Sequence, residues 1–175
     1  MPKIKLNGIE INYQWDGNEG QPILVLSNSL TTNLKLWDEQ IPSFAKHYRV
    51  LRYDNRGHGL SSSPEGEYIL DDIGGDVLAL MNYFSIDNAS FCGVSLGGMV
   101  GMWLGINAPD RIDKLVLCNT SSNVAPPEPW QARIDTVNKG GMSSIGNAVL
   151  ERFLSSNSRT KDTHKVELVN SMLLS

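Results

Sequence analysis

"FCGVSLGGMVGMW", residues 91–103, places one serine between two glycines at the point where an apolar run ends. The run at residues 89–94 has the length and composition of a strand buried on both faces. Residues 99–106 are apolar nearly all round, which predicts a central, buried helix that ends at Pro109. The stretch therefore predicts a strand, a sharp turn at Ser95 and a helix.

The spacing Gly93-Val94-Ser95-Leu96-Gly97 matches the G-x-S-x-G motif, in which a strained strand-to-helix turn exposes the serine oxygen. Side chains two positions before and after the serine would collide, so we interpret Gly93 and Gly97 as structural. Ser95 is the candidate nucleophile, and the free N–H groups at the helix start would stabilise negative charge beside it. The alternative is that Ser95 is an ordinary N-cap residue after a glycine turn.

An oxyanion hole needs two backbone N–H groups near the attacked carbonyl. One is expected from Leu96, the residue after the candidate nucleophile. The second is expected from the loop after the first buried strand, "SNSLTTN" at residues 27–33, with Leu30 as the candidate donor. Asn28 and Ser29 in this loop are equally consistent with an ordinary polar turn.

The first 124 residues alternate strand and helix patterns. Residues 3–15 alternate apolar and polar side chains around Asn7-Gly8, which predicts a β-hairpin. Further buried strands are expected at residues 22–28, 48–54 and 113–119. Apolar residues recur at helical spacing in two stretches: Leu36, Trp37, Ile41 and Phe44, with Pro42 near the end, and Ile73, Val77, Leu80, Met81 and Phe84. The pattern predicts an α/β fold, a mostly parallel sheet with helices on both faces.

A proline-rich break, "VAPPEPW" at residues 124–130, marks a change of character. Only helical patterns follow it, in three stripes separated by Gly140-Gly141 and by residues 155–162: Trp130, Ile134 and Val137; Met142, Ile145, Val149 and Phe153; and Val166, Val169, Met172 and Leu173. We therefore expect two parts, a sheet domain at residues 1–124 and a helical segment at residues 125–175.

Composition bounds the class of protein. The 175 residues are 41% hydrophobic and 19% charged, with a net charge of −4, so neither nucleic acid nor an anionic membrane is an expected partner. There is no apolar stretch of membrane-spanning length and no signal-peptide pattern, so a cytoplasmic location is expected. Cys92 and Cys118 lie in strand patterns and are interpreted as free thiols rather than metal ligands.

The segment "YDNRGHGLSSSP", residues 53–64, follows a buried strand. It predicts a tight turn with an internal ion pair and hydrogen bonds among Asp54, Arg56, Gly57, Gly59 and Ser61. We assign His58 to this structural turn rather than to catalysis.

Three motifs in this order, the loop after the first parallel strand, "YDNRGHGLSS" and "GVSLGGM", resemble those of the α/β-hydrolase family. More narrowly, "LSNSLTTNLKLWDEQ", "RVLRYDNRGHGLSS", "FCGVSLGGMVGMWLG" and "LVLCNTSS" are similar to stretches of 3-oxoadipate enol-lactonases of the β-ketoadipate pathway of aromatic-compound catabolism. Thr31 departs from the pattern, because glycine is expected there.

The resemblance implies hydrolysis of 3-oxoadipate enol-lactone to 3-oxoadipate through an acyl-enzyme on Ser95, without a cofactor. The helical segment would be part of a cap over the sheet domain. The substrate carries a free carboxylate, which a cation should bind. Arg133 and Trp130 are the candidate substrate-binding residues; the alternative is that Arg133 is a solvated surface residue and Trp130 packs the cap on the core.

The acid and histidine of the family's triad follow the serine in the chain. Only His164 follows Ser95; it lies in the polar segment "KDTHKVEL", where Asp162 is two residues away and cannot face it on a helix. Asn119 stands where some relatives carry the acid. We therefore expect the N-terminal part of the fold, without the last strands, and a second polypeptide or a longer form that supplies both groups. Alone, the chain should be nearly inactive and prone to self-association, since losing the histidine of a serine protease lowers turnover on the order of 10⁶-fold.

Two other functions remain open from the sequence. One is a general carboxylesterase with the same fold and a different acyl substrate. The other is a non-catalytic binding protein, or a fragment, built on a hydrolase scaffold.

Overall fold

The computed structural model describes residues 2–124 and 126–175 and divides the chain into two compact units. The first unit is Met1–Ser122 and the second is Asn123–Ser175, a boundary two residues before the one expected from the sequence. Ala125, in the proline-rich break, lies outside the described residues. Each unit is described by itself below.

The first unit contains a six-stranded mixed sheet in the order β1-β2-β4-β3-β5-β6. Its strands are β1 (Lys3–Leu6), β2 (Ile9–Asp16), β3 (Ile23–Ser27), β4 (Arg49–Tyr53), β5 (Ala89–Val94) and β6 (Ile112–Cys118). The last four are parallel, and β1 and β2 form an antiparallel hairpin at one side. Asn7 and Gly8 make its turn with φ of 50° and 83°, as the Asn-Gly pair predicts. The predicted, mostly parallel α/β architecture is confirmed.

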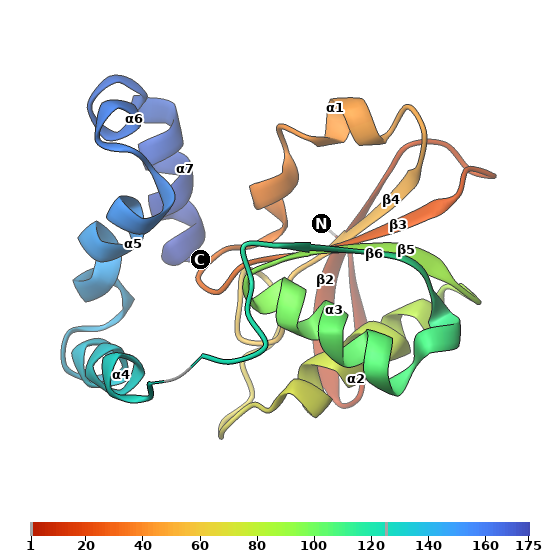
Figure 1. Cartoon of the computed structure of the whole chain (residues 1–175), viewed down its shortest axis with the longest axis horizontal. Helices are drawn as coiled ribbons and strands as arrows, with labels where there is room; N and C mark the ends of the chain where they lie inside the picture. Colours follow the sequence, from red (N-terminus) through yellow and green to blue (C-terminus); the bar gives the residue numbers. More distant parts are fainter. Residues whose placement is uncertain (1, 125) are drawn as a thin grey trace. The chain divides into compact units, whose positions relative to one another are not determined.

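Helices cover both faces of this sheet (Figure 1). The 3₁₀ helix η1 (Leu34–Trp37) and α1 (Ile41–Phe44) lie on one face, and α2 (Leu70–Tyr83) and α3 (Leu96–Asn107) lie on the other. A short 3₁₀ turn, η2 (Pro109–Arg111), follows α3. Each face of the sheet has its own hydrophobic core, and alternate strand residues contribute to one or the other. Val25, Leu51 and Phe91 pack toward α2 and α3. Leu24, Leu26 and Val50 pack with Trp37 on the opposite face.

The single helix expected around residues 36–44 is instead two short ones. Pro42 occupies the first turn of α1. Proline has no N–H to donate inside a helix, so it fits at a helix start and η1 cannot continue through it.

Two burial predictions are wrong for this chain. The strand β6 was expected to be buried, but Leu115, Val116 and Leu117 are exposed because β6 lies at the edge of the sheet. The helix α3 was expected to be central and buried, but Ile106 is 78% exposed. Its buried face consists of Gly97, Gly98, Val100, Gly101 and Leu104.

The second unit is helical. Its elements are α4 (Glu128–Gly140), the 3₁₀ helix η3 (Met142–Ile145), α5 (Gly146–Phe153), α6 (Ser156–Lys161) and α7 (Thr163–Leu173). The three predicted apolar stripes lie on α4, on η3 with α5, and on α7. The segment interpreted as a separator contains α6, which begins because the Ser155 hydroxyl accepts a hydrogen bond from the Ser158 N–H at 3.1 Å. Of the described helices, none is both long and apolar enough to cross a membrane.

Candidate active site

Ser95 occupies a strained turn between β5 and α3, with φ of 54° and ψ of −111°. Its backbone is fixed from several sides: its N–H donates to the Cys118 carbonyl at 2.9 Å, and its carbonyl accepts from the Met99 N–H at 3.0 Å and the Thr120 hydroxyl at 2.7 Å. The Ser95 side chain makes no capping hydrogen bond. The alternative of an ordinary N-cap serine is therefore wrong. Strain of this kind persists only where the surroundings impose it, and it clusters at functional sites.

Gly93 and Gly97 are required by close contacts on both sides of the turn. A Cβ atom on Gly93 would lie 2.1 Å from the Gly97 carbonyl oxygen. A Cβ atom on Gly97 would lie 2.3 Å from the Ser27 carbonyl oxygen, at the end of the neighbouring strand β3. Both distances are far inside van der Waals contact, so backbone would have to move. The structural reason inferred from the sequence is thus the one that the structure has.

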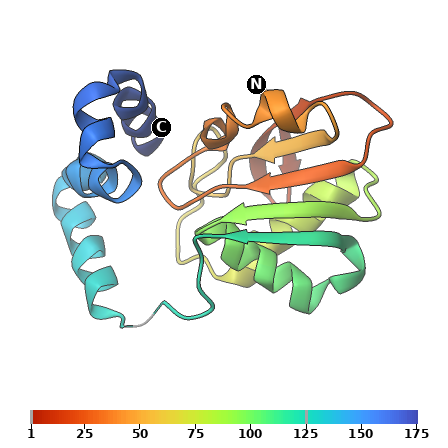
Figure 2. The same cartoon turned by 45° about the horizontal axis from the view of Figure 1, so that its top comes forward.

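The loop after β3 is tied directly to this turn. Strands β3 and β5 are parallel neighbours with Ser27 opposite Gly93, so their carboxyl ends meet at the same edge of the sheet (Figure 2). The Gly97 N–H donates to the Asn28 carbonyl at 3.0 Å. The Asn28 side chain donates to the Tyr53 carbonyl at 2.6 Å and accepts from Trp37 Nε1 at 2.9 Å. Through these hydrogen bonds the buried Asn28 fixes the loop against the start of α3.

The N–H groups of Leu30 and Leu96 have no acceptor among the described residues, and neither do those of Ser29 and Thr31 in the same loop. Two other N–H groups nearby are paired: that of Gly97 donates to the Asn28 carbonyl, and that of Thr32 donates to the Ser29 carbonyl at 3.2 Å. Leu30 and Leu96 were the two donors expected from the sequence. The unpaired N–H groups of Leu30 and Leu96 are consistent with that expectation.

Thr31, where glycine was expected, has a φ of 67°. A β-branched residue is rare in this region because its Cβ atom crowds the backbone. Glycine has no Cβ atom, which explains why glycine suits this position. Thr31 is nevertheless buried, and its hydroxyl donates to the Leu30 carbonyl at 2.5 Å.

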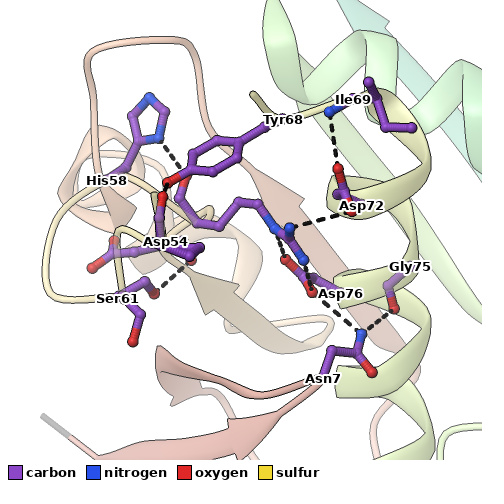
Figure 3. A network of polar contacts seen from close by, with 12 residues as sticks. Asn7, Asp54, His58, Ser61, Tyr68, Ile69, Asp72, Gly75 and Asp76 are labelled. Carbon is purple, nitrogen blue, oxygen red and sulfur yellow. Dashed lines mark hydrogen bonds and ion pairs between the residues drawn. The ribbon is translucent and has the colours of Figure 1, made fainter. Parts of the chain in front are cut away.

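The turn after β4 has the internal hydrogen bonds that were predicted but a different ion pair. Asp54 accepts from the Leu60 N–H at 2.9 Å and, through its carbonyl, from the Ser61 hydroxyl at 2.8 Å. The predicted internal ion pair is wrong. Arg56 instead reaches α2 and binds both carboxylate oxygens of Asp76, at 2.7 and 2.8 Å, with Asp72 at 3.4 Å (Figure 3).

His58 is held inside this turn rather than presented to a ligand. Its Nδ1 donates to the Arg56 carbonyl at 3.0 Å, since a carbonyl can only accept. Burial lowers the pKa of His58 below its ordinary 6.5, partly offset by this bond and by the Asp54 charge. The assignment of His58 to the structural turn fits these contacts.

The two thiols are free, as interpreted from the sequence. Cys92 is buried in β5, and Cys118 ends the adjacent strand β6. Burial, together with the neighbouring Cys118, raises the pKa of the Cys92 thiol to about 12. Within the described residues, no cluster of three or more histidine, cysteine or acidic side chains has the arrangement of a metal site.

Trp130 and Arg133 lie on α4 of the second unit. The Arg133 guanidinium sits over the Trp130 ring, 5.9 Å from its centroid, and Trp130 Nε1 donates to the Val124 carbonyl at 3.0 Å. Arg133 is half-buried, so it is not a fully solvated surface residue.

His164 and Asp162 do not form a catalytic pair. The Asp162 carboxylate caps α7, accepting from the Lys165 N–H at 3.0 Å, and lies 3.5 Å from the Lys165 ammonium. The exposed His164 lies in the first turn of α7. Asn119, at the end of β6, adopts a positive φ of 45°, which asparagine tolerates better than most residues.

Two residues that support the site could not be identified from the sequence. Thr120 fixes the Ser95 carbonyl, and the buried Tyr53 hydroxyl lies 2.8 Å from the Ser27 hydroxyl beside the turn. Both contacts depend on which strands become neighbours, and no local motif encodes that order.

Comparison with known proteins decides the family. Residues 22–162 match the family described as the alpha/beta hydrolase fold. The chain belongs to the α/β-hydrolase fold family.

Among its relatives are two 3-oxoadipate enol-lactonases of Acinetobacter baylyi. One is 41% identical over 145 residues, 83% of this chain and 54% of the relative, and the other is 34% identical over 148 residues, 85% and 55% respectively. The crystal structure of the enol-lactonase from Burkholderia xenovorans LB400 superposes with a TM-score of 0.95 at 38% identity, covering 98% of this chain and 67% of that one. This α/β-hydrolase chain thus spans about half the length of the curated relatives it matches.

Proposed function

We propose that this α/β-hydrolase chain carries the nucleophile of a serine hydrolase that opens a carboxylate-bearing enol-lactone, 3-oxoadipate enol-lactone, to give 3-oxoadipate. The observation that carries the proposal is Ser95 itself: a strained serine whose hydroxyl does not cap its own helix. The similarity to two 3-oxoadipate enol-lactonases supports the choice of substrate.

In the proposed reaction, Ser95 Oγ attacks the lactone carbonyl carbon and loses its proton to a base. The negative oxygen that forms is stabilised by the N–H groups of Leu30 and Leu96 and by the N-terminus of α3. The ring C–O bond then breaks, and the leaving enolate takes up a proton and becomes a ketone. Water hydrolyses the acyl-enzyme to a carboxylate and restores Ser95. No cofactor takes part in these steps.

The base and its acid are proposed to lie outside this chain, in a further segment of the same protein or in a second polypeptide. Within the described residues, the Ser95 hydroxyl has no hydrogen-bonding side chain, and the contacts of His58 and Asp162 are structural. The second unit is proposed as part of a cap in which Trp130 and Arg133 bind the substrate carboxylate. The cytoplasm is the proposed location.

The decisive experiment is labelling with a fluorophosphonate, which reacts quickly only with an activated serine. The protein with its complementing segment should be labelled at Ser95, the Ser95→Ala variant should not, and a variant of an exposed serine away from the turn, Ser63→Ala, should remain labelled. If Ser95 stays unlabelled in the complemented protein, the chain is a non-catalytic binding protein and the enzyme proposal fails.

Substrate competition tests the chemical class. A carboxylate-bearing enol-lactone should be hydrolysed with a kcat/KM at least about tenfold above that of a neutral ester such as p-nitrophenyl acetate, because one guanidinium–carboxylate contact contributes that much. A preference for the neutral ester would instead indicate a general carboxylesterase.

A further inference from the structure

The second unit contains a cavity of about 360 Å³ between α4, η3 and α5. Both helices contribute side chains to it at the same spacing, i, i+1 and i+4: Ala132, Arg133 and Thr136 from α4, and Ala148, Val149 and Arg152 from α5. Since residues four apart share a helix face, one arginine of each helix borders the same space.

The two arginines have no counter-ion in the part of the chain that is described. No ion pair joins Arg133 or Arg152 to a carboxylate there. Glu151, next to Arg152 in sequence, pairs with Arg159 at 3.0 Å instead. Burial lowers the pKa of Arg133, and the positive charge of Arg152 lowers it further. The half-buried Arg133 and the exposed Arg152 thus border the same space as two like charges, and an anion between them would offset their repulsion.

The two guanidinium groups are the side-chain hydrogen-bond donors in the lining that remain free for a ligand, because the hydroxyl groups there already donate to the backbone. The Thr136 hydroxyl donates its hydrogen to the Ala132 carbonyl at 2.8 Å. The Ser144 hydroxyl has the Gly141 carbonyl at 2.6 Å and the Thr136 carbonyl at 3.1 Å as acceptors. A hydroxyl has one hydrogen, so neither has a donor left for a ligand.

The rest of the lining is apolar. Ile145 and Val149 are 6% and 3% exposed and form a hydrophobic floor. Trp130 positions Arg133 by stacking beneath its guanidinium. A ligand that suits this cavity has an anionic end and a short aliphatic body.

We propose that Arg133 and Arg152 together bind one carboxylate of a short aliphatic acid whose carbon chain lies over Ile145 and Val149. This inference rests on the proposed hydrolase function, in which the ligand is the carboxylate end of the lactone. It adds Arg152 as the second half of a two-arginine carboxylate site. Two planar guanidinium groups can bind both carboxylate oxygens with directed hydrogen bonds, which a single lysine cannot do.

The test is calorimetric titration of the full protein with adipate and with its neutral diamide, adipamide. The protein should bind adipate saturably and adipamide at least about tenfold more weakly. Arg133→Gln and Arg152→Gln should each weaken adipate binding at least about tenfold, since each removes a charged hydrogen-bond donor. Lys139→Gln is the matched control: it removes one positive charge from an exposed side chain of α4 outside the cavity and should change affinity less than about twofold.

Three results overturn the proposal: no saturable adipate binding, equal binding of adipamide, or an Arg152→Gln protein that binds adipate as the parent does. Circular dichroism checks that the variants fold. If Arg152→Gln does not fold, Arg152→Lys replaces it, and it should still weaken binding because it keeps the charge but loses the planar fork.

The outcome is separable from that of the hydrolase proposal. Adipate binding without fluorophosphonate labelling of Ser95 leaves the anion site standing and removes the enzyme. Labelling of Ser95 without adipate binding supports the hydrolase proposal and overturns the two-arginine anion site.

Discussion

Ser95 and Thr31, which follows the candidate donor Leu30, carry side chains on backbone with positive φ, at 54° and 67°. For Ser95, hydrogen bonds from Met99, Thr120 and to Cys118 impose the conformation and leave the hydroxyl unpaired. For Thr31, no comparable gain is visible, since its hydroxyl reaches only the preceding carbonyl. Strain at Ser95 is thus tied to the proposed chemistry, whereas strain at Thr31 is a cost that glycine would avoid.

Thr31→Gly is therefore expected to stabilise the fold slightly. Relief of the left-handed conformation is worth roughly 1–2 kcal/mol, and the greater freedom of glycine when unfolded offsets about half of it. Thr32→Gly is the matched control: its hydroxyl donates to the Ser29 carbonyl at 2.8 Å and its φ is not positive, so that change should destabilise. Urea unfolding measures both. A Thr31→Gly protein less stable than the parent would contradict the strain argument.

His58 makes stability depend on pH. Its folded pKa lies below 6.5 because burial disfavours the charged form, so the unfolded chain binds the proton first as pH falls. The stability contributed by neutral His58 is complete above about pH 6.5 and decreases as pH falls from there toward the folded pKa. His58→Asn keeps an N–H that can donate to the Arg56 carbonyl but cannot titrate. The loss of unfolding free energy between pH 7.5 and 5.5 should be smaller in this variant; an equal loss would show that His58 is not its source.

At the scale of elements, the junction of β5 and α3 was predictable because its requirements are local. Glycine is required at 93 and 97 because a side chain there would collide with residues close to Ser95 or with the end of one neighbouring strand. Where two interacting residues lie far apart in the chain, their pairing could not be predicted from the sequence. Arg56 pairs with Asp76, twenty residues away on α2, because the helix face that meets the turn follows from packing that no local motif encodes.

Replacing Gly97 and Gly105, which lie in the same helix, with alanine should change the stability of the fold in opposite directions. Gly97→Ala would place its Cβ atom 2.3 Å from the Ser27 carbonyl and should destabilise by roughly 2–3 kcal/mol while slowing labelling of Ser95. Gly105→Ala meets only the Leu115 side chain at 3.5 Å, an ordinary contact, and should stabilise by up to about 1 kcal/mol through helix propensity. Thermal unfolding of the pair measures the difference, and similar effects at both positions would contradict the clash.

At the scale of the whole molecule, strand order determines exposure. The apolar runs of β5 and β6 look alike in sequence, yet β5 lies between β3 and β6 while β6 is the edge strand. The composition of a strand does not encode its place in the sheet, so the sequence predicted burial for both. In β6, Leu115 and Leu117 pack beside Gly101 of α3, and Val116 points to the other face with 51% of its surface exposed.

An edge strand with exposed apolar side chains is a template for pairing with another copy of the chain. We expect the 175-residue chain to self-associate through β6. Val116→Lys places a positive charge on the exposed face of that edge, where a second strand would bury it, so the associated fraction should fall several-fold while the fold is kept. Leu60→Lys is the matched control, because Leu60 is equally exposed, at 50%, but lies in the turn after β4. Sedimentation velocity of the parent and both variants at equal concentration measures the effect. If Leu60→Lys lowers association as much as Val116→Lys does, association follows general surface hydrophobicity and not the β6 edge.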